Sequence, residues 1–286
     1  MPRPSNDSLA VEYAREGYLV VPDLLDPAAI DAARAEAASI CRGERGSFDG
    51  LVPPPGDEPD ADLLRRYLCI HFPHKISALL LELARLPGAL DVLTTVIGPN
   101  VKLMQSMLFI KSAGRPGQAW HQDETHIPTR DRSLTAVWLA LDDATVENGC
   151  LWVIPGSHRS GVLHNVREQN DHRYDCTQEA YDFGYREQDA IPVEVSAGTA
   201  VVFNGHLLHR SLPNTSRHGM RRALVNHYMS AESLLPWFPP TSSEAMGQLD
   251  HRDVLLVAGR DPYASRGITD ITKPHVRPDG EGGCIR

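Results

Sequence analysis

The chain has 286 residues, 42% of them hydrophobic, and a formal net charge of -9 with a pI near 5.8. Nucleic acids and anionic membranes attract proteins that carry a surplus of Lys and Arg, so neither is expected as the main partner. No apolar run approaches the ~20 residues that span a bilayer, and the N-terminus lacks an apolar core of signal-peptide length. We therefore expect a cytoplasmic protein with a single domain over residues 1–286.

The first 99 residues predict a mostly helical N-terminal part that packs on the rest of the chain. Capping residues and the helical spacing of apolar side chains indicate helices, with one short β-branched strand after the first of them. The expected helices cover residues 5–17, 26–40, 75–86 and 89–98, and the strand covers residues 18–22. Residues 50–62, rich in proline and acids, are expected to hold no regular structure.

From residue 100 to residue 230 the pattern changes to short apolar runs bounded by turn residues. These runs occupy residues 101–111, 133–144, 150–157, 191–205 and 221–230. Strands without helices between them are typical of an antiparallel barrel or a two-sheet jelly roll. The polar insert at 161–190 is too long for a simple hairpin, so a lid or a disordered loop is expected there. Residues 231–286 form a C-terminal extension, with a mobile tail expected after Val276.

Two histidines and two acids crowd the segment WHQDETHI at 120–127. His121 and Asp123 are two residues apart, so on a strand they project from one face and can reach one ion. His126 is a weaker candidate, because two residues that are five positions apart on a strand, such as His121 and His126, point to opposite faces. An exposed turn would give the same pattern, so a third ligand decides between the two interpretations. His206 and His209 both follow a predicted strand and both offer one.

Two histidines and one carboxylate on one face of an ion are the ligand set of non-haem Fe(II) oxygenases. A zinc hydrolase would use three such ligands and a water. The downstream segment RHGMRR separates these chemistries, because 2-oxoglutarate chelates iron through its keto acid and leaves a second carboxylate to be neutralised. Arginine holds a carboxylate through two parallel hydrogen bonds. Of Arg221 and Arg222, which begin a predicted strand, one would face the interior.

Taken in order, WHQDETHI, Trp138, ENGCLWVIPGSHR and HRSLPNTS followed by RRAL resemble motifs of the phytanoyl-CoA dioxygenase family of Fe(II)/2-oxoglutarate-dependent oxygenases. The opening segment EGYLVVPDLLDPAAID is similar to that family as well, and the resemblance spans residues 11–230. It implies a double-stranded β-helix, which is a mainly β jelly-roll barrel with flanking helices on one sheet. It also implies an Fe(II) ion, with 2-oxoglutarate and O₂ as cosubstrates.

The resemblance assigns the iron ligands to His121, Asp123 and His209. His209 is preferred to His206 because only His209 precedes Ser and Asn at the spacing of the family pattern. The arginine that binds the far carboxylate of 2-oxoglutarate falls on Arg221, with Arg222 facing away. Further cosubstrate contacts fall on Ser211, Met107, Trp138, Gln122 and Lys75.

The implied reaction is hydroxylation of an unactivated C–H bond, with succinate and CO₂ as co-products. Related halogenases have Gly or Ala at the carboxylate position, so Asp123 favours hydroxylation over halogenation. The expected substrate is a small metabolite or natural product, and an acyl-CoA is the alternative, because the acidic chain shows no cluster of cations for CoA phosphates. The insert at 161–190 and the segment with Trp237 and Phe238 are candidate substrate walls. A zinc hydrolase and a non-catalytic binding protein are rival interpretations, and the oligomeric state stays open.

Overall fold

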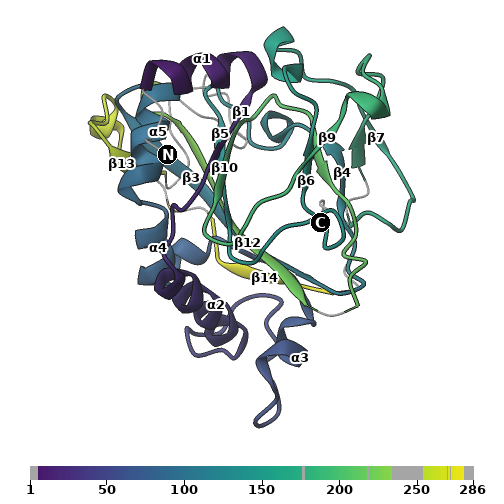
Figure 1. Cartoon of the computed structure of the whole chain (residues 1–286). Coiled ribbons are helices and arrows are strands. Elements are labelled where there is room, and N and C mark those ends of the chain that lie inside the picture. The colour runs from purple at the N-terminus through teal and green to yellow at the C-terminus, as the bar shows by residue number, and fades with distance from the viewer. Residues whose placement is uncertain are drawn as a thin grey trace, which may run out of the picture.

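The computed structural model describes residues 6–175, 178–217, 219–233, 254–268, 270 and 272–279. Two antiparallel sheets lie face to face, and helices cover the outer face of the larger one (Figure 1). This arrangement confirms the predicted jelly-roll barrel with flanking helices. Within the described ranges, no helix is long and apolar enough to cross a membrane.

The larger sheet has eight strands. Across the sheet their order is β1 (Tyr18–Val21), β10 (Ala200–Asn204), β5 (Thr135–Ala140), β12 (Met220–Ser230), β3 (Val101–Ser112), β2 (Tyr67–His71) and β14 (His275–Pro278), and β13 (Leu255–Ala258) pairs with β3. Because β13 and β14 belong to this sheet, the C-terminal extension takes part in the barrel. Residue 276, after which a mobile tail was expected, lies within β14, and residues 280–286 are outside the described part.

The smaller sheet contains β4 (Gln118–His121), β11 (His209–Ser211), β6 (Leu151–Val153) and β9 (Ile191–Val193), in that order. A separate hairpin of β7 (Val166–Glu168) and β8 (Gln178–Ala180) lies within the insert at 161–190. The insert therefore contains a short hairpin beside the smaller sheet, and most of its other described residues are irregular (Figure 1). Its service as a lid stays a prediction.

The helices are α1 (Asn6–Glu16), α2 (Pro27–Cys41), α3 (Asp60–Leu64), α4 (Ala78–Leu83) and α5 (Pro87–Val96). Asp26 caps α2 as its sequence predicts, since its carboxylate accepts a hydrogen bond from the Ala29 N–H at 2.8 Å. Two expectations were wrong. The short helix α3 begins inside residues 50–62, where no regular structure was expected, and residues 67–71 form a strand that the apolar pattern did not reveal.

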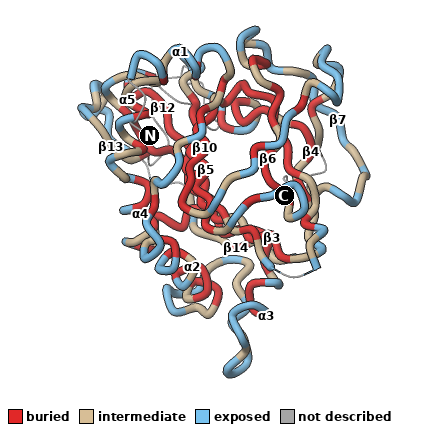
Figure 2. Tube along the Cα trace, viewed as in Figure 1, coloured by how far each residue is buried: buried red, intermediate tan, exposed pale blue. Residues whose placement is uncertain are grey.

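The strands at the centre of the larger sheet bury both of their faces. On β5, Val137 and Leu139 pack outward with the helices, whereas Ala136 and Trp138 pack inward between the two sheets. The burial colours of Figure 2 follow this division, with red concentrated along the central strands. Side chains that alternate along a central strand thus serve either the helical layer or the interior of the barrel, where the candidate site lies.

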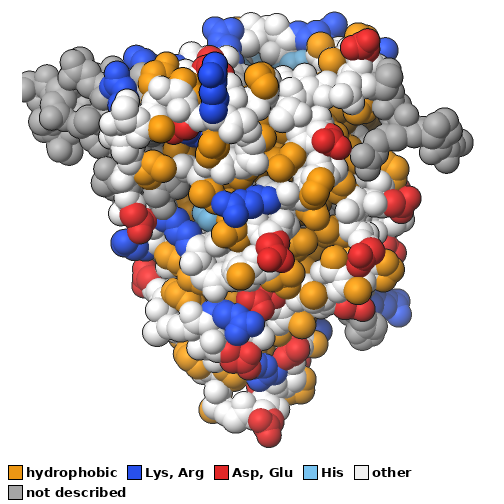
Figure 3. All heavy atoms as spheres, turned by 90° about the vertical axis from the view of Figure 1, so that its left-hand side faces the viewer, with side chains coloured by type: hydrophobic (Ala, Val, Ile, Leu, Met, Phe, Trp, Pro, Cys, Tyr) orange, Lys and Arg blue, Asp and Glu red, His pale blue; other side chains and the backbone are white. Residues whose placement is uncertain are grey.

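The surface over the helical layer carries charges of both signs. On the face shown in Figure 3, basic and acidic side chains are interspersed and do not gather by sign. On that face, the basic side chains therefore form no continuous patch.

Candidate metal centre

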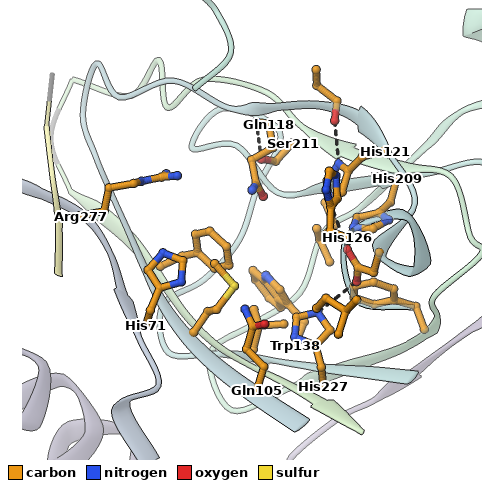
Figure 4. A pocket seen from close by; sticks show the side chains of 18 of the residues that line it. His71, Gln105, Gln118, His121, His126, Trp138, His209, Ser211, His227 and Arg277 are labelled. Atoms are coloured by element: carbon orange, nitrogen blue, oxygen red, sulfur yellow. Dashed lines mark hydrogen bonds and ion pairs between the residues drawn. The ribbon is translucent and has the colours of Figure 1, made fainter. Parts of the chain in front are cut away.

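Three predicted iron ligands meet at one end of the barrel interior. Strand β4 pairs with β11 so that His121 lies directly opposite His209, and Asp123 follows β4 as the first residue of the 3₁₀ turn η2 (Asp123–Thr125). The Oδ1 atom of Asp123 lies 3.6 Å from Nε2 of His121 and 3.5 Å from Nε2 of His209. One ligand atom from each residue lies within 4.8 Å of the other two. The arrangement can hold one ion (Figure 4).

Backbone carbonyls fix the orientation of both imidazoles. Nδ1 of His121 lies 2.8 Å from the Ala119 carbonyl oxygen, and Nδ1 of His209 lies 2.9 Å from that of Leu207. Because a carbonyl only accepts, each Nδ1 carries the hydrogen, and each Nε2 is left with a lone pair that faces Asp123. This is the common way in which proteins prepare histidine for a metal.

The protonation states of the cluster suit a cation. Burial, reinforced by the neighbouring His209, lowers the pKa of His121 to about 3, so its imidazole is neutral at physiological pH. Burial alone would raise the pKa of Asp123, but the facing imidazoles of His209, His227 and His121 hold it below its ordinary value. The imidazoles of His121 and His209 and the carboxylate of Asp123 together form a donor set that fits Fe(II).

A fourth residue, His227, holds the other oxygen of Asp123. Its Nε2 lies 3.1 Å from Asp123 Oδ2, and its side chain is buried. The sequence analysis did not identify His227. The period of two along β12 carries the signal, because His227 shares the parity of Arg221 and both line the same cavity.

A cavity of about 210 Å³ extends from the ligand cluster into the barrel. Four of the predicted cosubstrate contacts line it: Arg221, Ser211, Met107 and Trp138. Arg221 is 4% exposed, and its guanidinium carbon lies 5.5 Å from the centre of the Trp138 ring. Burial lowers the pKa of Arg221 to about 10, which leaves it cationic at neutral pH.

Nothing in the described part of the chain neutralises Arg221. Its Nε is buried without a hydrogen-bond partner, and no described carboxylate forms an ion pair with it. Arg222 points to the opposite face, where it binds Asp142 through two hydrogen bonds of 2.8 Å. The alternation along β12 therefore directs one arginine into the cavity and one outward, as the sequence analysis expected.

Gln122 and Lys75, two residues predicted to contact the cosubstrate, do not line the cavity. The amide of Gln122 donates to the carbonyls of Val162 and His206 and accepts from the His164 N–H. Since His121 and Asp123 point inward, the residue between them points out of the cavity, so Gln122 ties the start of the insert to the ligand turn. His206 takes part through this carbonyl and is not in the ligand cluster.

Lys75 also lies outside the cavity lining, because its ammonium is held by the C-terminal segment. Its Nζ donates to Asp270 at 2.9 Å and to both oxygens of Thr272 at 2.6 Å. The remaining candidates have mixed outcomes. His126 lines the cavity 6.4 Å from the His121 ring without joining the ligand cluster, and Trp237 and Phe238 fall outside the described residues.

Comparison with known proteins places this geometry in a family. The profile of the phytanoyl-CoA dioxygenase (PhyH) family matches residues 13–223. The chain belongs to the phytanoyl-CoA dioxygenase family. The resemblance inferred from the sequence is thereby confirmed, and the cluster of His121, Asp123 and His209 lies within the matched range.

Curated relatives match about half of the chain. Phytanoyl-CoA dioxygenase 1 of Oryza sativa subsp. japonica is 40% identical over 132 residues, which are 46% of this chain and 45% of that protein. Phytanoyl-CoA dioxygenase domain-containing protein 1 of Danio rerio is 36% identical over 157 residues, covering 52% of each. The chain thus spans about half the length of the curated relatives that it matches.

Solved structures share the fold over nearly the whole chain. The carbocyclase SnoK from nogalamycin biosynthesis superposes with a TM-score of 0.66 at 23% identity, covering 90% of this chain and 97% of its own. EctD from S. alaskensis with bound Fe superposes with a TM-score of 0.61 at 21% identity, covering 85% and 84%. These likenesses confirm the fold and extend it beyond the part matched by the curated relatives.

Proposed function

We propose that this protein is an Fe(II)/2-oxoglutarate-dependent dioxygenase that hydroxylates an unactivated C–H bond of a small metabolite or natural product. The observation that carries the proposal is a buried guanidinium, that of Arg221, without an ion-pair partner in the cavity that also holds the ligand cluster. A buried cation without a counter-ion is costly, so this one indicates an anionic ligand.

The residues present fit the cofactor pair. His121, Asp123 and His209 would hold Fe(II) and leave positions open on the ion for a chelating 2-oxo acid and O₂. When bound, the iron and 2-oxoglutarate together supply an oxidant strong enough for an unactivated C–H bond, with succinate and CO₂ as co-products. The chain's own part is to bind, orient and exclude water.

The far carboxylate of 2-oxoglutarate would lie between Arg221 and Ser211. The planar guanidinium can bind it through two hydrogen bonds, and Trp138 covers one side of the arginine. Ser211 Oγ accepts hydrogen bonds from Lys111 Nζ at 2.8 Å and from the Gln118 N–H at 3.2 Å. With both lone pairs engaged, the Ser211 hydroxyl is left to donate into the cavity that it lines.

The lining of the cavity favours a small substrate over an acyl-CoA. Away from the ligand cluster and Arg221, the lining includes neutral side chains such as Gln105, Phe109 and Gln178, and its other arginine, Arg277, pairs with Asp175. The two insert arginines that could approach CoA phosphates are already paired, Arg167 with Glu179 and Arg173 with Asp171. An acyl-CoA stays the alternative, because the rice relative is named a phytanoyl-CoA dioxygenase.

Anaerobic titration tests the cofactor assignment. Fe(II) followed by 2-oxoglutarate should produce the weak visible charge-transfer band of the chelate, and admission of air should release succinate. Arg221→Ala should weaken 2-oxoglutarate binding by roughly 10- to 100-fold, as expected for a lost charge-assisted pair. Arg222→Ala, on the outer face of the same strand, is the matched control and should bind 2-oxoglutarate like the parent.

The rival functions give different results. A zinc hydrolase on the same ligands would show no band and no dependence on Arg221, and a non-catalytic binding protein would release no succinate. For the substrate, pools of small metabolites and a series of acyl-CoA thioesters are compared for succinate release above the uncoupled rate. Stimulation by the thioesters alone would contradict a small-metabolite substrate and support the alternative.

A further inference from the structure

A second basic residue, Lys111, is buried beside Arg221, outside the lining of the large cavity. The two residues are direct partners in the antiparallel pairing of β3 with β12, so their side chains leave the sheet on the same face. Lys111 is 6% exposed and Arg221 is 4% exposed. A small cavity of about 20 Å³ is lined by Lys111, Arg221 and Ser211 together.

The ammonium of Lys111 is surrounded by acceptors without charge. Its Nζ lies 2.8 Å from Ser211 Oγ, 2.8 Å from the Leu212 carbonyl and 3.4 Å from the Gly149 carbonyl. Three acceptors match the three hydrogens of an ammonium group. Among the described residues, no carboxylate forms an ion pair with Lys111.

The backbone at Gly149 is shaped to admit this ammonium. Its φ of +84° is left-handed, and a Cβ placed on it would lie 2.9 Å from Lys111 Nζ and 2.4 Å from the Leu212 carbonyl oxygen. Only glycine therefore leaves room for the lysine at this position. Gly149, the glycine of the segment ENGCLW, therefore leaves space for the Lys111 side chain in addition to forming a turn.

The charges around Lys111 leave a local excess of positive charge. Arg221 faces it from β12, the Cys150 thiol faces it from the turn before β6, and Asp175 faces it from the insert. Asp175, however, already forms an ion pair with Arg277. Burial, with Arg221 adding to it, lowers the pKa of Lys111 well below its ordinary value. An incoming anion would therefore stabilise the charged forms of both Lys111 and Arg221.

We propose that Lys111 is a positioning residue of the cosubstrate site, which holds the Ser211 oxygen so that its hydroxyl points at the far carboxylate of 2-oxoglutarate. The inference rests on the proposed function and goes beyond the family pattern, which reaches Ser211 and Arg221 but not Lys111. Its consequence is selectivity: the lysine favours 2-oxo acids that end in a second carboxylate over those that do not.

The test compares two chelating acids on the anaerobic Fe(II) protein. The charge-transfer band is titrated with 2-oxoglutarate and with 2-oxobutyrate, which chelates in the same way but lacks the far carboxylate. Lys111→Met should weaken 2-oxoglutarate binding by roughly 10- to 100-fold and leave 2-oxobutyrate binding unchanged. In turnover, the KM for 2-oxoglutarate should rise while kcat changes little. Equal affinity of variant and parent for 2-oxoglutarate would overturn the proposal.

Two further variants separate positioning from stability. Lys102→Met removes another buried lysine of β3, one that pairs with Asp261 at 3.0 Å, and should leave the selectivity intact. Ser211→Ala should lose the same selectivity, and the double variant with Lys111→Met should lose little more, because both act on one hydroxyl. If the two losses instead multiply, Lys111 does not act through Ser211. Should Lys111→Met fail to fold, Lys111→Gln is titrated in its place, and Ser211→Ala still decides whether the hydroxyl reads the far carboxylate.

Failure of this inference and failure of the proposed function are distinguishable. If the unmodified protein gives no band with Fe(II) and 2-oxoglutarate, the proposed function is wrong. If it gives the band and Lys111→Met keeps the full preference for 2-oxoglutarate over 2-oxobutyrate, only the role of Lys111 is wrong.

Discussion

The imidazole of His227 donates to the Asp123 oxygen that faces away from the ligand histidines, with Nε2 3.1 Å from Oδ2. This bond fixes the rotation of the carboxylate, so that Oδ1 alone is offered to the metal. We expect His227→Phe to weaken Fe(II) binding by about 10- to 100-fold, the usual effect of losing a hydrogen bond behind a ligand. Titration with Fe(II) under anaerobic conditions measures this effect. His206→Gln, a histidine outside the ligand cluster, is the control, and equal losses in both variants would contradict the role of His227.

Asp123 is expected to be indispensable for both metal binding and turnover. Asp123→Ala removes one of the three ligands and leaves two neutral imidazoles, so iron affinity and succinate formation should both fall to background. Loss of turnover with iron binding unchanged would show that the carboxylate is not a ligand. The fold should persist, because Asp123 lies at the cavity and not in either main apolar cluster, and circular dichroism of the variant checks this.

Gln122 is expected to affect the local stability of the insert more than the binding of the cosubstrate. Gln122→Ala removes hydrogen bonds to the backbone of Val162 and His164, and each lost bond costs about 0.5–1.5 kcal/mol. Amide hydrogen exchange should therefore accelerate near residues 162–168, while 2-oxoglutarate affinity stays close to that of the parent. A selective loss of 2-oxoglutarate affinity with unchanged exchange would instead support the cosubstrate contact inferred from the family pattern.

The pairing of Glu36 with Arg45 predicts a pH dependence of stability. Arg45 donates to both carboxylate oxygens of Glu36, at 2.8 Å and 2.7 Å, and these bonds lower the pKa of Glu36 below its ordinary 4.5. The stabilisation is thus fully present above about pH 4.5 and is lost as the pH falls through the lower folded-state value. Glu36→Gln should show a smaller loss of Tm than the parent between pH 6 and pH 3. Identical pH profiles would rule this pair out as a source of acid sensitivity.

Sequence patterns predicted correctly those features of the structure that depend only on residues close together along the chain. The cap at Asp26, the strands after residue 100 and the opposite orientations of Arg221 and Arg222 all follow from such rules. The strand β2 was missed because its residues are buried through pairing with distant β3 and β14 and do not alternate. Tertiary pairing of this kind overrides local pattern.

The candidate site likewise contains residues that the sequence patterns predicted and residues that they missed. Its ligand cluster could be predicted because the spacing of His121 and Asp123 is tied to one ion, and the family pattern named four further residues that line the cavity. Lys111 and His227 were not predicted, because each contacts a side chain, Ser211 or Asp123, that is remote in sequence. Gln122 and Lys75 show the converse error, since proximity to a motif does not determine where a side chain points.

One irregularity in the pairing of β4 with β11 has a wider consequence. His209 lies opposite His121, yet Ser211 lies opposite Gln118, so β4 carries one extra residue between these two pairs. That extra residue lets Gln118 and His121, which are three positions apart on β4, both face the cavity beside Ser211 and His209. The chelating imidazoles consequently meet only after two segments distant in the chain have docked in this single register. A nascent or partly unfolded polypeptide cannot assemble the three-ligand centre, so a metal ion could bind there only after the barrel has closed.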